Sequence, residues 1–166
     1  MKRIARLRVP LGFAFAVIVL WLARPTPRSL VIGGIIALAG EMIRIWAAGH
    51  LEKGREVTSS GPYAFTRHPL YLGSTIIGIG LAIGAGSLPV AIVVIAYLAV
   101  TLTAAIRTEE AHLTEKFGAA YPDYRAGRAS VTRVFSFERA MRNREYRALL
   151  GLAAVLSFLC WKAFVM

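Results

Sequence analysis

Residues 87–106 read SLPVAIVVIAYLAVTLTAAI, a run of mostly apolar residues that contains no charged side chain. A helix needs about 20 residues to cross the roughly 30 Å hydrocarbon core of a bilayer, so this run is long enough to span a membrane. Four further apolar stretches lie on either side of it, at 9–23, 29–51, 69–85 and 148–166. The sequence therefore predicts an all-α fold, an integral membrane bundle of about five transmembrane helices.

The composition of the 166-residue chain agrees, since 57% of its residues are hydrophobic and 17% are charged. These values exclude a disordered chain and argue against an ordinary soluble globule. The net charge is +11, but the basic residues fall between apolar blocks. The expected anionic partner is therefore a membrane leaflet and not a nucleic acid. A single cysteine, Cys160, and three scattered histidines predict no disulfide and no metal site.

Lysine and arginine are distributed unevenly between the two predicted faces of the membrane. If the N-terminus is cytoplasmic, sixteen of these residues fall inside and three outside, and Arg44 lies within the second span. This asymmetry follows the positive-inside rule. We expect an integral protein of the bacterial inner membrane, with its N-terminus in the cytoplasm and its C-terminus outside. Both predicted outer loops are short, so any chemistry is expected at the cytoplasmic face.

The segment before the third span brings a cation, an imidazole and a phenol close together. Residues 61–73 read GPYAFTRHPLYLG, and Pro69 suits the first position of a helix because its missing N–H would be unpaired there. Arg67, His68 and Tyr71 then lie at the cytoplasmic mouth of that helix. The helix N-terminus and Arg67 together favour an anionic group at this position.

The segment after the fourth span carries paired carboxylates. It begins with RTEEAHL at residue 107, in which Glu109 and Glu110 are adjacent. One helical hairpin, out across the membrane and back, separates this segment from the first, so both return to the same face. We therefore expect a site there for a ligand that carries both charge signs and an aromatic ring.

Together these two segments resemble a known family. The pattern Arg-His-Pro-x-Tyr at 67–71, followed by Glu-Glu-x-x-Leu-x-x-x-Phe-Gly-x-x-Tyr-x-x-Tyr at 109–124, is similar to isoprenylcysteine carboxyl methyltransferases and the related phospholipid methyltransferases. The resemblance covers residues 41–128. It implies a membrane-embedded enzyme that takes S-adenosylmethionine (SAM) from the cytosol. The acceptor that it implies is an isoprenylcysteine-like carboxylate or a related lipid, such as a phospholipid headgroup amine.

The resemblance also implies the residues of the site. The expected cofactor contacts are His68, Tyr71, Gly78, Gly80, Glu109, Glu110, Tyr121 and Tyr124. The glutamates would accept hydrogen bonds from the ammonium group and the ribose of SAM, and the glycines would let a bulky ligand lie against the helix backbone. Arg67 and Arg44 are the candidate catalytic residues, with Arg44 holding an anionic substrate head.

Several of these residues have a second interpretation in packing or anchoring. Arg44 lies three residues after Glu41, so the two side chains can form an ion pair on one helix face. Gly80 and Gly84 form a Gly-x-x-x-Gly pattern, which is typical of close helix packing. The two tyrosines that end the second motif can be anchors at the membrane interface.

The whole chain, 1–166, is predicted to form one membrane domain. The family-like core covers 41–128. A basic segment at 131–147 alternates apolar residues with arginines, as expected of a helix that lies on an anionic leaflet. Members of the family commonly end soon after the Tyr-x-x-Tyr stretch, so the span at 148–166 is an addition. It would either line the site or mediate oligomerisation.

Two other functions fit the same residues. Sterol or lipid reductases that use NADPH share a similar helical core, and a non-enzymatic membrane scaffold would use the basic loops to bind lipid. Replacement of Glu109 and Glu110 would damage a methyltransferase but would have no consequence for a scaffold. A carboxylate acceptor needs no general base, whereas for an amine or a thiol the candidate bases are His68, His112 or a glutamate.

Overall fold

The computed structural model describes residues 16–118, 123, 126 and 133–165, and its regular structure is helical. The helices are α2 (Pro27–His50), η1 (Gly61–Ala64), α3 (Pro69–Gly84), α4 (Leu88–Phe117), α6 (Phe137–Arg142) and α7 (Tyr146–Val165), and residues 16–22 are also helical. No strand occurs among the described residues, so the prediction of an all-α fold is confirmed. Tyr121 and Tyr124 lie outside the described residues.

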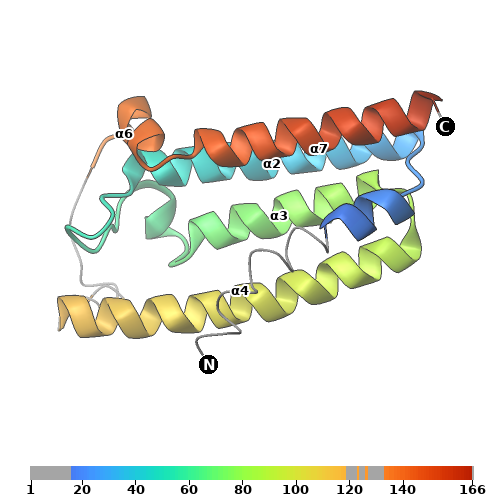
Figure 1. Cartoon of the computed structure of the whole chain (residues 1–166). Coiled ribbons are helices and arrows are strands. Elements are labelled where there is room, and N and C mark those ends of the chain that lie inside the picture. The colour runs from blue at the N-terminus through green and yellow to red at the C-terminus, as the bar shows by residue number, and fades with distance from the viewer. Residues whose placement is uncertain (1–15, 119–122, 124–125, 127–132, 166) are drawn as a thin grey trace.

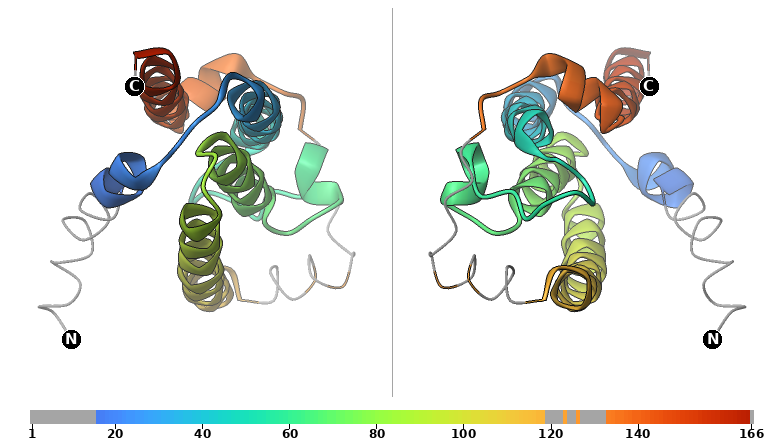
Figure 2. Two further views of the ribbon diagram at one scale, coloured as in Figure 1. Left: turned by 90° about the vertical axis from the view of Figure 1, so that its right-hand side faces the viewer. Right: turned by 90° about the vertical axis from the view of Figure 1, so that its left-hand side faces the viewer.

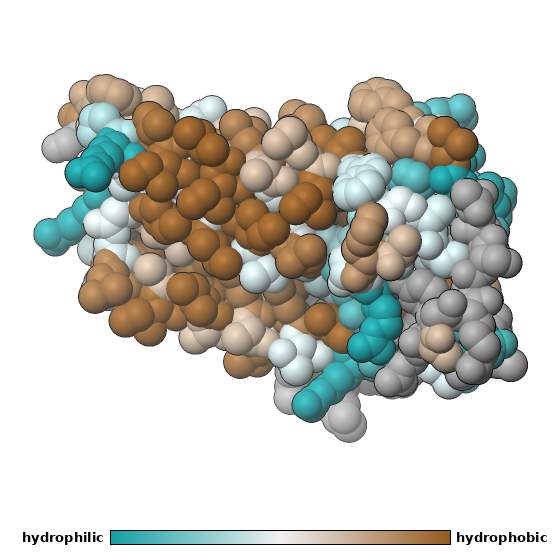
Figure 3. Space-filling view, turned by 180° about the vertical axis from the view of Figure 1, so that it is seen from behind, coloured by the Kyte–Doolittle hydropathy of each residue, from teal (hydrophilic) through white to brown (hydrophobic). Residues whose placement is uncertain are grey.

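Among the described residues, three helices, α2, α4 and α7, are long and apolar enough to cross a membrane. Helix α3 is also apolar, but it has 16 residues, fewer than a typical span. The first predicted span, 9–23, is described only from residue 16 onward. Apolar residues gather across the middle of the face seen in Figure 3, with hydrophilic residues toward its two ends. This distribution and the three apolar helices indicate a membrane protein.

Helices α2 and α3 form the central pair of the bundle, and glycines bring their backbones into direct contact. A Cβ atom on Gly40 would lie 2.7 Å from the Gly73 carbonyl oxygen, and a Cβ atom on Gly80 would lie 2.6 Å from the Gly33 carbonyl oxygen. Real Cβ atoms essentially never approach other atoms that closely, so this helix spacing requires glycine. Figures 1 and 2 show α3 between α2 and α4, with α7 alongside α2.

The turn between α3 and α4 depends on Gly86, whose backbone φ of 61° is rarely adopted by residues other than glycine. The N–H of Arg24 donates to the Ala85 carbonyl at 2.7 Å and so ties the segment before α2 to this turn. Nearby, the ammonium of Lys162 in α7 donates to the Leu20 carbonyl at 3.1 Å. These contacts close the end of the bundle that is opposite α6 (Figure 1).

Helix α4 is longer than the apolar run that predicted it. It continues past Ile106 to Phe117 because the polar residues that follow are mostly good helix formers. Its 30 residues, at 1.5 Å per residue, give a length of about 45 Å, which exceeds the thickness of the hydrocarbon core. The last turns of α4 therefore extend beyond the apolar part and carry Glu109 and Glu110 to the end of the bundle where α6 lies, called the α6 end below.

The basic segment predicted at 131–147 forms a shorter helix than expected, and several of its arginines face the protein. Helix α6 has only 6 residues. Arg139 Nε lies 2.8 Å from Glu52 Oε1, and Arg133 pairs with Glu56 in the same loop. The alternating pattern could not reveal these partners because the two glutamates lie far away in the sequence. Part of the positive charge is thus neutralised within the protein.

Candidate functional site

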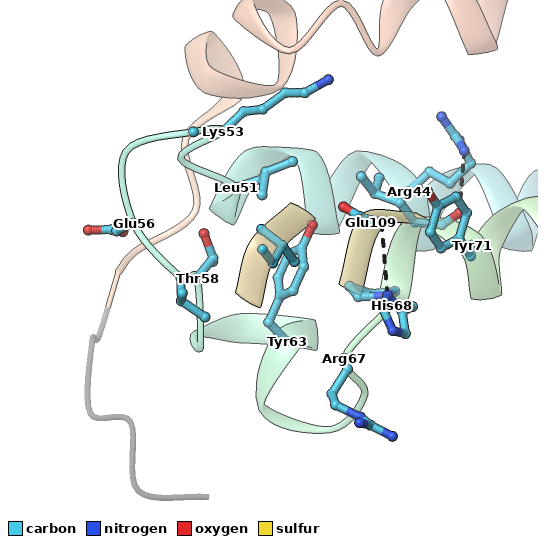
Figure 4. A pocket seen from close by; sticks show the side chains of 15 residues that line it. Arg44, Leu51, Lys53, Glu56, Thr58, Tyr63, Arg67, His68, Tyr71 and Glu109 are labelled. Atoms are coloured by element: carbon cyan, nitrogen blue, oxygen red, sulfur yellow. Dashed lines mark hydrogen bonds and ion pairs between the residues drawn. The ribbon is translucent and has the colours of Figure 1, made fainter. Parts of the chain in front are cut away.

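The α6 end of the bundle holds a pocket of about 290 Å³ that is lined by separate segments of the chain (Figure 4). These segments are the end of α2, the loop 51–58, η1 with the start of α3, and the extension of α4. The predicted site residues that line the pocket are Arg44, Arg67, His68, Tyr71 and Glu109. Small-molecule sites commonly have volumes of about 300–1,000 Å³, so the pocket is just below the smallest of them.

The two sequence motifs meet at this pocket. His68 Nε2 lies 3.1 Å from Glu110 Oε1, and Arg67 Nη1 lies 3.5 Å from the same oxygen. The other ring nitrogen, His68 Nδ1, lies 4.0 Å from Glu109 Oε2. The Tyr71 ring is centred 5.8 Å from the imidazole. A guanidinium, an imidazole, two carboxylates and a phenol therefore form one cluster, although the motifs that supply them are separated by a whole helical hairpin.

The hydrogen bond between His68 Nε2 and Glu110 Oε1 orients the imidazole in the pocket. The His68 side chain is 15% exposed and Glu109 is 45% exposed, so the imidazole is the sheltered member of the cluster and Glu109 the open one. Glu109 is therefore the carboxylate that a ligand in the pocket can reach directly.

The start of α3 adds an anion-binding element to the pocket. His68 is the N-cap residue of α3, and its side chain makes no capping hydrogen bond because it faces the glutamates. Pro69 follows at the first helical position, and Pro69, Leu70 and Tyr71 all line the pocket. The first N–H groups of a helix have no partner within that helix and carry partial positive charge, so the first turn of α3 favours a negatively charged ligand group.

Arg44 reaches the pocket from α2 and is held by two other segments. Its Nε lies 2.6 Å from Glu145 Oε1 and 3.9 Å from Glu41 Oε2. Its Nη1 donates to Ser74 Oγ at 2.5 Å and to the Leu70 carbonyl at 3.3 Å. The ion pair expected between Arg44 and Glu41 is thus present, but the contact with Glu145 is the closer one. Arg44 is a fixed cation in the wall of the pocket.

Gly78 and Gly80 lie away from this pocket. Gly80 faces α2, where the absence of a side chain lets the Gly33 carbonyl approach. Gly78 faces Leu98 of α4 and lines a separate apolar cavity of about 300 Å³ among the helices. Among the described residues, neither glycine contributes to the lining of the pocket at the α6 end. Of the two interpretations of Gly80, its surroundings match close helix packing.

Another cavity, of about 560 Å³ and different from the one beside Gly78, adjoins the pocket along α4. The two cavities share Lys53, Tyr71 and Glu109. The other residues that line this cavity belong to α4 and are Val100, Thr101, Ala104, Ala105, Thr108 and His112. The charged cluster is therefore continuous with the side of a helix that is long and apolar enough to span the membrane.

The loop 51–58 forms one wall of the pocket and is tied to the C-terminal part of the chain. Arg133 Nη2 donates to Glu56 Oε2 at 2.9 Å, and a second bond joins Arg133 Nε to the other carboxylate oxygen. The hydrogen bonds from Arg133 lower the pKa of Glu56. In return, the pKa of Arg133 is raised. A carboxyl whose pKa is lower in the folded protein stabilises the fold above its unfolded pKa, and this contribution is lost in acid.

The thermal stability that the Glu56–Arg133 pair contributes should depend on pH. At pH 7 we expect Arg133→Gln to melt at a lower temperature than the wild-type protein. The difference should shrink as the pH falls below the ordinary pKa of a glutamate, about 4.3, toward the lowered pKa of Glu56 in the folded protein. Melting curves of detergent-purified protein between pH 7 and 3.5 measure this, with the exposed Arg147→Gln as the matched control. A difference that stayed constant across the pH range would contradict the prediction.

Sequence reasoning missed three residues of this region. Tyr63 is buried and lines the pocket, and its position in the Gly-Pro-Tyr turn before α3 was the available signal. Ser74 lies one turn after the first residues of α3 and accepts from Arg44, a role that a serine in an apolar helix could have suggested. Glu145 is separated from Arg44 by 101 positions, and no local pattern marks it.

Comparison with known proteins identifies the class of this protein. A sequence model of the phospholipid methyltransferase family matches residues 12–120, and the chain belongs to that family. Family membership supports a membrane methyltransferase. The cobalt-zinc-cadmium resistance protein CzcN of Cupriavidus metallidurans is 32% identical over 94 residues, which cover 55% of this chain and 44% of CzcN. The match thus spans less than half of that relative. No solved structure matches this chain.

Proposed function

We propose that this protein transfers a methyl group from SAM to a lipophilic acceptor in the membrane, an isoprenylcysteine-like carboxylate or a related lipid. The observation that carries the proposal is the cluster of Arg67, His68, Glu109 and Glu110 at a pocket beside helices that can span a membrane. Family membership supports the class of reaction, and the charges of the cluster support a cofactor site at this pocket.

The charges of the cluster match those of the amino-acid end of SAM, which carries a carboxylate and an ammonium group. Arg67 and the first turn of α3 are donors for the carboxylate, and Glu109 and Glu110 are acceptors for the ammonium group or the ribose hydroxyls. The cluster already pairs its own charges at 3.1 to 4.0 Å. A zwitterion can replace each of these partners by a group of the same sign, so that no charge is left unpaired.

The two adjoining cavities offer room for a cofactor and for the reacting head of an acceptor. Tyr71 borders both cavities, and an aromatic ring in that position can stack on a planar base. The lining along α4 would accommodate the apolar part of the acceptor near its head. Arg44, fixed by Glu145, is the candidate to hold an anionic acceptor head.

When bound, SAM supplies an electrophilic methyl group on a sulfonium sulfur. The part of this chain is to orient the two reactants in line and to exclude water, which together supply much of the acceleration in such a displacement. A carboxylate acceptor is ionised at neutral pH and loses no proton. For an amine acceptor, Glu109 in the pocket or His112 in the adjoining cavity would take the proton.

We further propose that the α6 end faces the cytoplasm, with the N-terminus inside, the C-terminus outside and the protein in the bacterial inner membrane. The positive-inside distribution of lysine and arginine supports this orientation. It would place the pocket where SAM is available. The arginines that are not paired within the protein would then contact the anionic leaflet.

Calorimetry on the detergent-purified protein tests the cofactor. We expect SAM and its demethylated product, S-adenosylhomocysteine (SAH), to bind and NADPH not to bind. Radioactive methyl from SAM should then appear in a prenylated cysteine analogue or in a phospholipid added as mixed micelles. Binding of NADPH without SAM would favour the reductase, and binding of neither by folded protein would overturn the proposal.

A further inference from the structure

The segment 133–145, which contains α6, lies beyond residue 120, where the family match ends. In Figure 1 this segment crosses the end of α2, beside the loop that forms a wall of the pocket. Apart from the contact of Glu145 with Arg44, none of the roles assigned above to the cofactor or the acceptor uses it. Its contacts reach the pocket wall at both ends of the segment, and most of them are part-buried.

The segment first completes the C-terminus of α2. Asn143 Nδ2 donates to the Ala48 carbonyl at 2.9 Å and to the Leu51 carbonyl at 2.8 Å, and the N–H of Ser136 donates to the Gly49 carbonyl at 3.1 Å. The last carbonyls of a helix have no partner within that helix. Residues from the C-terminal segment therefore take the place of a local cap at the point where α2 passes into the loop.

Arg139 then fixes the loop itself. Its Nε lies 2.8 Å from Glu52 Oε1, and its Nη1 donates to the Gly49 carbonyl at 2.6 Å. The side chains of Arg139 and Glu52 are 13% and 11% exposed, so this pair is largely shielded from water. Charge-assisted bonds in a shielded position are short and directional. Arg142 Nη2 also lies 3.2 Å from Glu52 Oε1, but the Arg142 side chain is exposed, so loss of Arg139 leaves Glu52 with only this weaker partner.

The loop held in this way supplies a large part of the pocket. Its lining residues are Leu51, Lys53, Gly54, Glu56, Val57 and Thr58. Glu52 lies among them in the sequence, but it is not part of the lining and pairs with Arg139 instead. At the other end of the segment, Glu145 holds Arg44, the cation on the facing wall, at 2.6 Å.

From these contacts we infer that segment 133–145 positions both walls of the cofactor pocket, with Arg139 and Glu145 as its positioning residues. The inference rests on the proposed function, because it concerns the affinity of the same pocket for SAM. A loop without helical hydrogen bonds keeps one conformation only if something outside it opposes its conformational entropy. Arg139 does this for the loop 51–58, and Glu145 does it for the Arg44 guanidinium.

Two measurements on the full-length protein in detergent test the inference. Hydrogen exchange reports on the loop 51–58 without any ligand, and calorimetry with SAH reports on the pocket. For Arg139→Gln we expect faster exchange in the loop and SAH binding that is about tenfold weaker. For Glu145→Gln we expect weaker SAH binding with little change in loop exchange, because Arg44 lines the same pocket as the residues proposed to hold the cofactor. Arg147→Gln, an exposed arginine of the same part of the chain, should match the wild-type protein in both measurements.

The outcomes separate this inference from the proposed function. If the wild-type protein binds SAH and both variants bind it with the affinity of the wild-type protein, the pocket does not depend on the segment and the inference is wrong. Unchanged exchange in the loop of Arg139→Gln would also overturn it, whatever the affinity. A lower melting temperature with unchanged affinity in the folded fraction would show a structural role only and would count against it. Absence of SAH binding by folded wild-type protein would overturn both proposals.

Discussion

The double variant Glu109→Ala, Glu110→Ala is expected to bind SAH at least 100-fold more weakly than the wild-type protein, while its folded fraction stays high. Calorimetry on detergent-purified protein measures the affinity, and a melting curve measures the folded state. The two side chains are 45% and 28% exposed, so their loss leaves no large cavity in the protein. The effect should therefore fall on the site and not on the bundle.

The size of this effect follows from the bonds that disappear. A hydrogen bond to a charged group contributes about 1.5–3 kcal/mol, so two such bonds correspond to roughly 3–6 kcal/mol, or a factor of about 10²–10⁴ in affinity. Loss of Glu110 also removes the partner that lies 3.1 Å from His68 Nε2 and 3.5 Å from Arg67 Nη1. These donors would then be free to rotate out of the geometry that the ligand requires.

Single substitutions distinguish a direct contact from an indirect one. Glu109 lines the pocket, so Glu109→Gln should weaken binding by removing a charge that the ligand meets. Glu110→Gln keeps an acceptor oxygen for His68 and should weaken binding less. Glu115→Ala removes an exposed carboxylate from the same helix and is the matched control. If the double variant bound SAH as tightly as Glu115→Ala does, the cluster would not be the cofactor site.

The all-α fold and the meeting of the two motifs could be predicted because both depend on properties that are local in sequence. Hydrophobic length identifies α2, α4 and α7 as candidate spans, and Pro69 marks the first residue of α3. A hairpin of two helices returns the chain to its starting face, so His68 and Glu110 could be expected at the same end of the bundle.

The fixation of the pocket walls could not be predicted, because it depends on side chains that are distant in sequence. Arg44 has an acidic neighbour at i−3, Glu41, yet its closest carboxylate belongs to Glu145. Arg139 belongs to a pattern that is typical of lipid-facing helices, yet it pairs with Glu52. Periodicity describes one element at a time, and it carries no information about which element will supply the partner of a charge.

Gly80 is one of the residues for which the sequence left two interpretations open, and it gives the second large effect. Gly80→Ala should lower the melting temperature by about 10 °C, because overpacking of a tight interface costs about 3 kcal/mol and each kcal/mol shifts the midpoint by about 2–4 °C in a chain of this size. The new Cβ atom would lie 2.6 Å from the Gly33 carbonyl oxygen. That atom belongs to the backbone, so α2 and α3 would have to separate.

Gly34→Ala is the matched control for this prediction, because a Cβ atom on Gly34 meets no other atom within 4 Å. Alanine is the better helix former by about 1 kcal/mol, so this variant should be as stable as the wild-type protein or slightly more stable. A melting temperature of Gly80→Ala equal to that of Gly34→Ala would contradict the backbone contact. The affinity of the remaining folded protein for SAH then separates the two interpretations of Gly80. A packing residue lowers the melting temperature first, whereas a cofactor contact would lower the affinity at full stability.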